Sequence, residues 1–179
     1  MGLAKELRDE KIREKKNLIV ETVFSSNEKL EFMKNTKEYD VNLIFIGTDN
    51  VEINASRISQ RVAMGGHSVP IEKIKPRYLR FIENLILAFK ENLCHKLFII
   101  DNSSDSNPYK PYFYFENKNL VWMNKELSIQ NFKIQKSYES VPDWILIIGD
   151  ALIELSNNIY LNENQLSSFT DQLNYPFGL

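Results

Sequence analysis

The sequence predicts an α/β domain in which a parallel sheet is flanked by helices. Short apolar runs rich in β-branched residues recur at residues 17–24, 41–47 and 96–101, as in buried strands. Segments with apolar residues at helical spacing separate these runs. After residue 102 the pattern changes to two short apolar runs around a polar turn, which predicts a β-hairpin appended to the sheet.

Length and composition limit the class of protein. A chain of 179 residues fits one domain, with an expected α/β core over residues 1–103 and a hairpin and helical extension over 104–179. The net charge of −2 provides no basic field for nucleic acid or for an anionic membrane. Cys94 is the sole cysteine, which indicates a reducing compartment, and no run approaches the roughly 20 apolar residues that span a bilayer. We expect a cytoplasmic protein with no nucleic-acid or membrane partner.

The first half of the chain alternates helices and strands. Residues 2–16 have the pattern of an exposed helix with few apolar anchors. Residues 17–24, NLIVETVF, predict a buried strand, and the serines and asparagine after it offer caps for a helix over 28–37. Residues 41–47, VNLIFIG, predict the second strand, and Thr48, Asp49 and Asn50 supply its turn. This order is strand, helix, strand.

Two further helices precede the third strand. In the first, Val51, Ala55, Ile58 and Val62 share one face that we expect to pack on the sheet. Gly65 and Gly66 end that helix, because glycine accepts the left-handed conformation of a last turn. A second amphipathic helix starts near residue 71 and leads into the strand KLFIID at 96–101.

The remaining segments read as an appendage to the sheet. The runs YFYF and LVWM, on either side of residues 116–119, predict the hairpin. Residues 137–142 form a break, residues 144–155 predict a helix, and residues 162–179 form a weakly amphipathic tail.

Polar residues follow or interrupt each predicted strand, and ligands of open parallel sheets bind at the carboxyl ends of strands. Asp101 ends an apolar strand, so it either holds a magnesium ion or caps the next turn. Glu21 lies in an apolar run, where an unpaired charge is costly to bury, so it should face a cavity or a partner. Thr48 and Asp49 are expected to cap the helix that follows.

The arginines around the Gly-Gly stop form the second candidate site. Arg57 and Arg61 are spaced to face one anion, and Arg77 and Arg80 are spaced likewise beyond the glycines. Guanidinium groups on a hinged lid would neutralise the charge on a transferring phosphoryl group. The alternative is a solvated helix face, which spacing alone favours. His67, in the turn, contacts either a phosphate or the backbone.

The stretch RISQRVAMGGHSVPIEKIKPRYLRFIENL, preceded by NLIVETVFSS and followed by LFIIDNSS, resembles the zeta toxin family of P-loop kinases. The similarity covers about residues 3–103. The zeta toxin family includes a group of proteins called predicted ABC-type ATPases. It implies a P-loop NTPase-like sheet and phosphorylation of a nucleotide sugar with ATP and Mg²⁺. It implies a catalytic lid of Arg57, Arg61 and Arg77 at residues 57–77, with Arg61, Arg77 and His67 near the ATP phosphates. Glu21 and Thr22 would line the side of the phosphoryl acceptor. Toxins of this kind are paired with an antitoxin, which is a possible partner.

The kinase motif that cradles phosphates, G-x-x-x-x-G-K-[ST], does not occur in this chain. In the family this loop and the catalytic aspartate precede the segment that matches Met1. We therefore expect a truncated domain whose sheet lacks its first, central strand, leaving apolar edges exposed. Pro76 is expected to kink or delay the helix that begins near residue 71, which makes the position of Arg77 less secure.

The sequence supports three hypotheses. The first is a zeta toxin-like kinase domain that is inactive alone because its P-loop and catalytic aspartate are missing. The second is a non-catalytic phosphate-binding, nucleotide-binding or interaction module, including one half of a split enzyme whose partner chain bears the P-loop. The third is a nonfunctional remnant.

Overall fold

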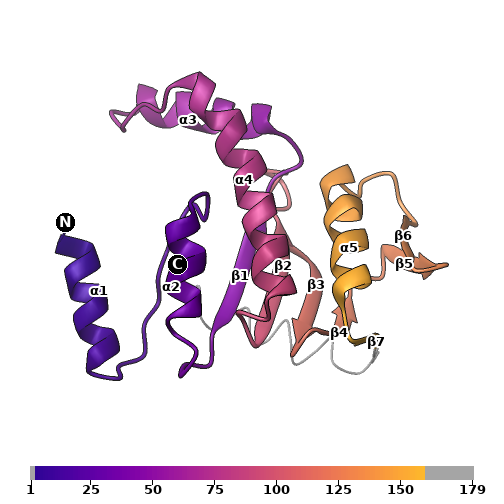
Figure 1. Cartoon of the computed structure of the whole chain (residues 1–179). Helices are drawn as coiled ribbons and strands as arrows, with labels where there is room; N and C mark the ends of the chain where they lie inside the picture. Colours follow the sequence, from indigo (N-terminus) through magenta and orange to yellow (C-terminus); the bar gives the residue numbers. More distant parts are fainter. Residues whose placement is uncertain (1–2, 160–179) are drawn as a thin grey trace.

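The computed structural model describes residues 3–159 of the chain, and the predicted tail at 162–179 lies outside the described residues. It shows a mixed α/β domain built around one five-stranded sheet and one separate hairpin (Figure 1). The strand order of the sheet is β1-β2-β3-β4-β7. The helices are α1 (Leu3–Arg13), α2 (Asn27–Lys34), α3 (Val51–Ala63), α4 (Ile71–Lys90) and α5 (Asp143–Leu155). The strands are β1 (Asn42–Gly47), β2 (Lys96–Asp101), β3 (Lys110–Glu116), β4 (Asn119–Met123), β5 (Leu127–Gln130), β6 (Lys133–Lys136) and β7 (Asn158–Ile159).

The sheet is mixed, so the predicted parallel sheet is only partly correct. β1 and β2 pair in parallel, from Asn42 opposite Lys96 to Gly47 opposite Asp101. β3 returns antiparallel to β2, β4 returns antiparallel to β3, and β7 pairs in parallel with β4. The loop between β2 and β3 holds no crossover helix, and a parallel connection needs a dozen or more residues. The chain therefore reverses direction at this point.

Helices α2, α4 and α5 contribute side chains to one apolar core with the sheet, and in Figure 1 α4 stands in front of the strands while α2 stands beside β1. α4 buries Leu85 and Phe89, and α5 buries Ile145 and Leu152. The ring of Phe89 meets that of Phe115 on β3 edge to face, with centroids 5.0 Å apart. Burial of these large apolar side chains is the main stabilising contribution to the domain.

Two hairpins follow β2. β3 and β4 form the hairpin that the sequence predicts, and the left-handed backbone of Asn117 and Lys118 makes its two-residue turn. The sequence did not predict the second hairpin, β5 and β6, which turns at Asn131 and Phe132 and also has positive φ there. Its backbone is held to α5, because the amide of Ile134 donates to Asp150 over 2.7 Å. The predicted helix over residues 144–155 is confirmed as α5.

The predicted strand at residues 17–24 is wrong. These residues belong to no helix or strand, and Ile19 is 101% exposed while Val23 is 66% exposed. Phe24 alone enters the core, at 5% exposure. A strand needs a hydrogen-bonding neighbour, and this segment has none among residues 3–159, because it runs between α1 and α2 and not along the outer edge of β1. The apolar composition of the run therefore produced neither strand nor burial.

Two other expectations about backbone structure are corrected. The predicted gap in the sheet is closed, because β1 and β2 pair directly over all six residues, and the open edge lies on the outer side of β1. α4 begins at Ile71 and contains Pro76, so the predicted late start is wrong. The proline deprives the Glu72 carbonyl of one helical hydrogen bond, and both residues are exposed, which lowers the cost of that loss because water can reach this side of the helix. No helix in residues 3–159 combines the length and the apolarity that crossing a bilayer requires.

Candidate functional site

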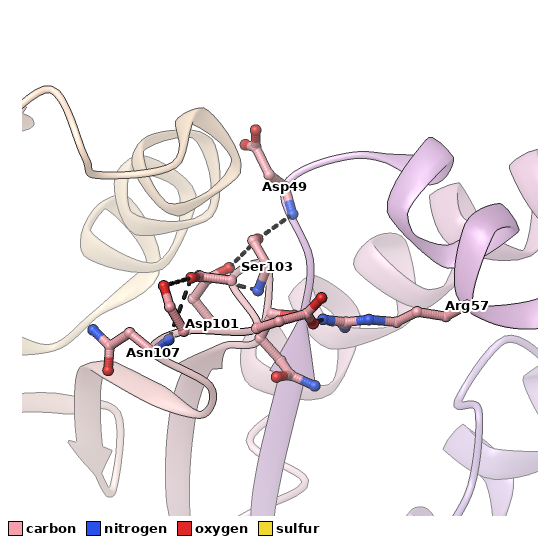
Figure 2. A network of polar contacts seen from close by, with 9 residues as sticks. Asp49, Arg57, Asp101, Ser103 and Asn107 are labelled. Carbon is pink, nitrogen blue, oxygen red and sulfur yellow. Dashed lines mark hydrogen bonds and ion pairs between the residues drawn. The ribbon is translucent and has the colours of Figure 1, made fainter. Parts of the chain in front are cut away.

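The candidate site lies where β1 and β2 end, at the carboxyl edge of the parallel pair (Figure 2). Register places Gly47 beside Asp101, so the loops that follow the two strands are neighbours. The amide of Asn102 donates to the carbonyl of Gly47 over 2.8 Å, which extends the pairing into the loops. The parallel pair is the only part of the predicted α/β core that brings two predicted clusters of polar residues together.

Asp101 is buried, at 3% exposure, and its carboxylate accepts three hydrogen bonds. Oδ1 accepts from the indole Nε1 of Trp144 over 2.8 Å and from the hydroxyl of Ser103 over 2.5 Å, and Oδ2 accepts from the amide of Ser103 over 3.2 Å. These donors compensate the loss of water around the charge. Asp101 therefore links α5 to the end of β2, as in the capping alternative. Its magnesium role stays a prediction, and residues 3–159 contain no group of three His, Cys, Asp or Glu side chains arranged to hold a metal.

Ser103 connects the two strand ends. Its hydroxyl donates to Asp101 and accepts from the backbone amide of Asp49 over 2.7 Å. Figure 2 shows this relay, with the carboxylate of Asp49 directed away from it. Asp49 thus contributes its backbone to the network, and its charged group stays available.

A second network surrounds Thr48, which is 7% exposed. The hydroxyl of Tyr78, on α4, donates to the Thr48 carbonyl over 2.8 Å, with the Asp49 carbonyl at 3.3 Å. Burial, together with the negative charges of Asp49 and Asp101, raises the pKa of Tyr78 to about 12. The hydroxyl consequently stays protonated at neutral pH and holds α4 against the end of β1.

The cap of α3 is Asn50, whose side chain accepts from the amide of Ile53 over 3.1 Å. The prediction that Thr48 and Asp49 cap this helix is therefore wrong. Thr48 instead accepts a hydrogen bond at its hydroxyl from Asn54, over 2.8 Å. A polar triplet at a strand end predicts that a cap exists, but the backbone geometry decides which member provides it.

Arg57 reaches the strand end from α3. Its Nη1 donates to the Asn102 carbonyl over 2.7 Å, and its Nη2 pairs with Asp105 over 2.8 Å. Figure 2 shows the side chain extended from the helix to this loop. Arg57 is therefore joined to the site, but its guanidinium group already has one carbonyl and one carboxylate as partners.

Among the other predicted lid residues, Arg61 lies on the same helix as Arg57, one turn further along. Arg61, His67 and Arg77 are exposed, and none of them forms an ion pair with another residue of the described range 3–159. The predicted Gly-Gly stop is confirmed: Gly65 has φ of +88°, and the amide of Gly66 donates to the Arg61 carbonyl over 2.9 Å. These exposed side chains lie on α3, on the loop and on the start of α4. We call residues 51–80 the helical arm.

Glu21 and Thr22 are not placed at a strand end, because their segment is not part of the sheet. Both are exposed, so Glu21 needs no buried partner. The hydroxyl of Thr22 accepts from the amide of Phe24 over 3.1 Å. Their predicted role next to a phosphoryl acceptor has no test in this geometry.

The helical arm projects from the domain. No residue of α3 is buried, so the predicted packing of its apolar face on the sheet is wrong. An open groove of about 650 Å³ lies between α3 and the start of α4. Its apolar lining comprises Val51, Ala55, Ile71, Ile74, Pro76 and Leu79, and its charged lining comprises Glu52, Glu72 and Lys75. The arm carries six lysine and arginine residues and two glutamates, although the whole chain has a net charge of −2.

The sequence analysis missed two residues that organise the site. Trp144 and Tyr78 come from helices far along the chain, and their polar atoms bond the ends of β2 and β1. The signal available in the sequence was weak: an indole and a phenol inside amphipathic helices need hydrogen-bond partners when buried. Which partners they find depends on how the helices pack.

Comparisons with known proteins identify no family. No family model matches the chain, and no solved structure matches it. A stretch of 61 residues, 33% of the chain, is 41% identical to an uncharacterized protein from Haemophilus influenzae. The match spans 44% of the length of that curated relative, less than half. The similarity to zeta toxins therefore rests on the sequence motifs quoted above.

Proposed function

We propose that this chain is a non-catalytic module that binds a phosphate-bearing anion through the helical arm. The observation that carries the proposal is the separation of charge within the chain. The arm has six basic residues against two glutamates, whereas the chain as a whole is acidic. Such a separation creates a local positive field that concentrates anions at the arm.

The exposed basic residues are the ones that suit this role. Arg57 is engaged by Asn102 and Asp105, so it supports the arm rather than the ligand. Arg61, His67 and Arg77 are exposed near the Gly-Gly joint. Arginine forks bind phosphate oxygens in pairs, which gives geometric selectivity as well as energy. The left-handed backbone at Gly65 allows the loop to adjust around such a ligand.

A thiol mechanism is disfavoured by the burial of Cys94. The side chain is 6% exposed, and burial raises its pKa to about 12. The thiol is therefore protonated at neutral pH, and the thiolate is the nucleophilic form. His95 turns to the exposed Asp40, with Nδ1 and Oδ1 3.0 Å apart, and does not act as a base for the cysteine.

A second candidate is the zeta toxin-like kinase that uses ATP and Mg²⁺. It is favoured by the connection from β1 through α3 and α4 to β2, which gathers Asp49, Asp101 and Arg57 at one carboxyl edge. Open α/β sheets bind ligands at such edges. In this candidate a second polypeptide supplies the P-loop that cradles the phosphates. Since β1 and β2 pair directly, a strand of that polypeptide has the outer side of β1 available.

Titration calorimetry with inorganic triphosphate tests the anion-binding proposal. We expect millimolar or tighter binding that weakens as salt is raised, because screening reduces attraction between exposed charges. The double variant Arg61→Ala/Arg77→Ala should weaken binding by about tenfold or more, equivalent to about 1.4 kcal/mol. Arg13→Ala removes an arginine of α1 and should leave binding unchanged. Equal binding by the double variant and the wild-type protein would contradict the proposal.

Kinase assays separate the two candidates. Phosphorylation of a nucleotide sugar from ATP by the purified 179-residue chain would overturn the non-catalytic assignment. Activity that arises only after co-expression with a P-loop-bearing chain would support the split enzyme. Triphosphate binding without activity in either assay supports the binding module.

A further inference from the structure

The outer edge of β1 is an unprotected sheet edge. β1 is the terminal strand of the described sheet, and its outward backbone groups have no neighbouring strand among residues 3–159. Natural edge strands are protected by charged residues, prolines, bulges, shortness or a covering helix or loop. β1 has six residues, NLIFIG, with no charged residue, no proline and no bulge. Its Ile44 and Ile46 remain 38% and 36% exposed.

A second unpaired element lies in the same chain. Leu18, Ile19, Val20 and Val23 are exposed, and their segment is a coil between α1 and α2. Runs of this kind, rich in β-branched residues and without proline or glycine, pair readily with sheet edges. Within residues 3–159 the chain thus exposes both a strand-forming segment and a sheet edge that pairs with no described strand.

The segment is held away from its own β1. α1 contacts α2 through Arg8, whose guanidinium lies 4.2 Å from the ring centroid of Phe32, and Tyr39 donates to the Ile12 carbonyl over 3.1 Å. At the other end Phe24 is buried, has φ of 56°, and its carbonyl accepts from Asn84 over 2.9 Å. Figure 1 shows the connection running between α1 and α2, on the far side of α2 from β1. Closing it onto its own sheet requires these contacts to break.

We propose that residues 17–23 of one copy add as a strand to the outer edge of β1 of a second copy, forming a reciprocal dimer. Strand period puts Leu18, Val20 and Thr22 on one face and Ile19, Glu21 and Val23 on the other. Apolar side chains are therefore present on both faces, so some meet Ile44 and Ile46 in either strand direction. The backbone groups of both elements gain hydrogen-bonding partners.

The area involved suits a specific dimer. Six exposed apolar side chains in each copy, twelve in the pair, would bury at most on the order of 1,000 Å², at roughly 60 to 120 Å² each, because they lie on both faces of the added strand. The paired backbones add to this. Stable interfaces bury about 1,200 Å² or more in total. The contact is therefore near the lower limit, and we expect a dimer that dissociates on dilution.

Light scattering coupled to size exclusion, over a range of concentrations of the full chain, tests the proposal. We expect a monomer at low concentration and a dimer at high concentration. In the dimer, hydrogen exchange should slow at residues 17–23 and at β1 together. Ile19→Glu and Ile44→Lys should each weaken the dimer by at least about tenfold. Ile147→Glu, at an exposed isoleucine of α5, is the matched control and should have no effect.

Mixing the two variants identifies the contact. The Ile19→Glu protein retains an intact edge, and the Ile44→Lys protein retains an intact segment, so one junction forms in a mixed dimer. We expect the mixture to associate more than either variant alone. A monomer at all concentrations overturns the proposal. So does a dimer that Ile19→Glu leaves intact, which would instead indicate pairing of β1 with β1. Protection of both segments in a monomer indicates closure within one chain and also overturns it.

Discussion

Helices α3 and α5 have the same length, 13 residues, and both have apolar residues at helical spacing, but their environments differ completely. α5 buries six residues against the sheet, among them Ile145 and Leu152. α3 buries none. An amphipathic pattern shows which face of a helix would be buried, and only a partner surface makes that burial occur. The packed half of the molecule has such a surface, whereas the helical arm and the edge of β1 do not.

The largest expected effect is the difference in unfolding free energy between a truncated side chain in α5 and one in α3. Leu152→Ala in α5 should lower the free energy of unfolding by about 2–5 kcal/mol, because it removes a fully buried side chain and leaves a cavity. Ile58→Ala in α3 should cost less than about 1 kcal/mol, because that residue is only half-buried. Urea unfolding followed by circular dichroism measures both. Equal losses would show that α3 is packed in solution.

Alanine substitutions at two glycines, Gly47 beside the core and Gly65 in the arm, compare the same two regions. Gly47→Ala places a methyl group 2.5 Å from the Trp144 ring, so we expect a loss of about 1–3 kcal/mol and a change in tryptophan fluorescence. Gly65→Ala, in the arm, meets no atom within 4 Å but has φ of +88°, so its cost is backbone strain of about 1–2 kcal/mol. Its fluorescence should match the wild type. A fluorescence change in Gly65→Ala would connect the arm to the core.

The link between α5 and the strand end is tested by Trp144→Phe. The variant removes the indole donor from the buried Asp101 carboxylate and should cost about 1–3 kcal/mol. Asp101→Asn weakens the same interaction, so the two changes should be less than additive in a double-mutant cycle. Additive losses would show that the hydrogen bond does not contribute to stability.

Alkaline pH tests the contact of the arm with the core at Tyr78. The pKa of Tyr78 is raised to about 12 in the folded protein, against 10.0 for an unperturbed tyrosine. Between these values the unfolded tyrosine ionises first, so stability is complete below pH 10 and declines as pH rises toward 12. Tyr78→Phe should cost about 1 kcal/mol at pH 7 and flatten this decline, as measured by urea midpoints. An unchanged slope would place the proton linkage elsewhere.

The smallest expected effect distinguishes the arginines within the arm. Arg57→Ala should cost up to about 1 kcal/mol, since it removes a partly exposed ion pair and a bond to a carbonyl. Arg61→Ala should leave stability unchanged, because Arg61 makes no ion pair in the described part of the chain. Thermal unfolding monitored by calorimetry measures the difference. A larger loss of stability for Arg61→Ala than for Arg57→Ala would show that Arg61, and not Arg57, supports the arm.

The sequence predicted those elements whose pattern and pairing agree. Strands β1 and β2, the hairpin β3 and β4, helix α5 and the Gly-Gly stop were all recognisable from period and turn chemistry. The strand expected at 17–24 is absent because this segment connects α1 to α2 and does not lie beside the outer edge of β1. The hairpin β5 and β6 was missed because its turn residues, Asn131 and Phe132, are not the usual glycine pair.

Part of the candidate site was also predictable. Asp101 at the end of an apolar strand and Arg57 on the helical arm that precedes this strand were expected near one edge. The loop residues Asn102 and Ser103 contact both. Arg61 and Arg77 were expected in the same place, but an exposed helical face offers no means of locating them from spacing. Trp144 could not be foreseen, because it follows Asp101 by 43 residues and reaches it through packing of α5.

The sequence alone determined the local elements, the excess of basic residues in the arm and the polar ends of β1 and β2, because these depend on neighbouring residues and on composition. Only the tertiary structure decided that the sheet is mixed, that no residue of α3 is buried and that the outer edge of β1 pairs with no other strand of the described range. The physical reason is that burial and strand pairing are properties of two surfaces. A sequence segment specifies one of these surfaces, and the fold determines whether the other is present.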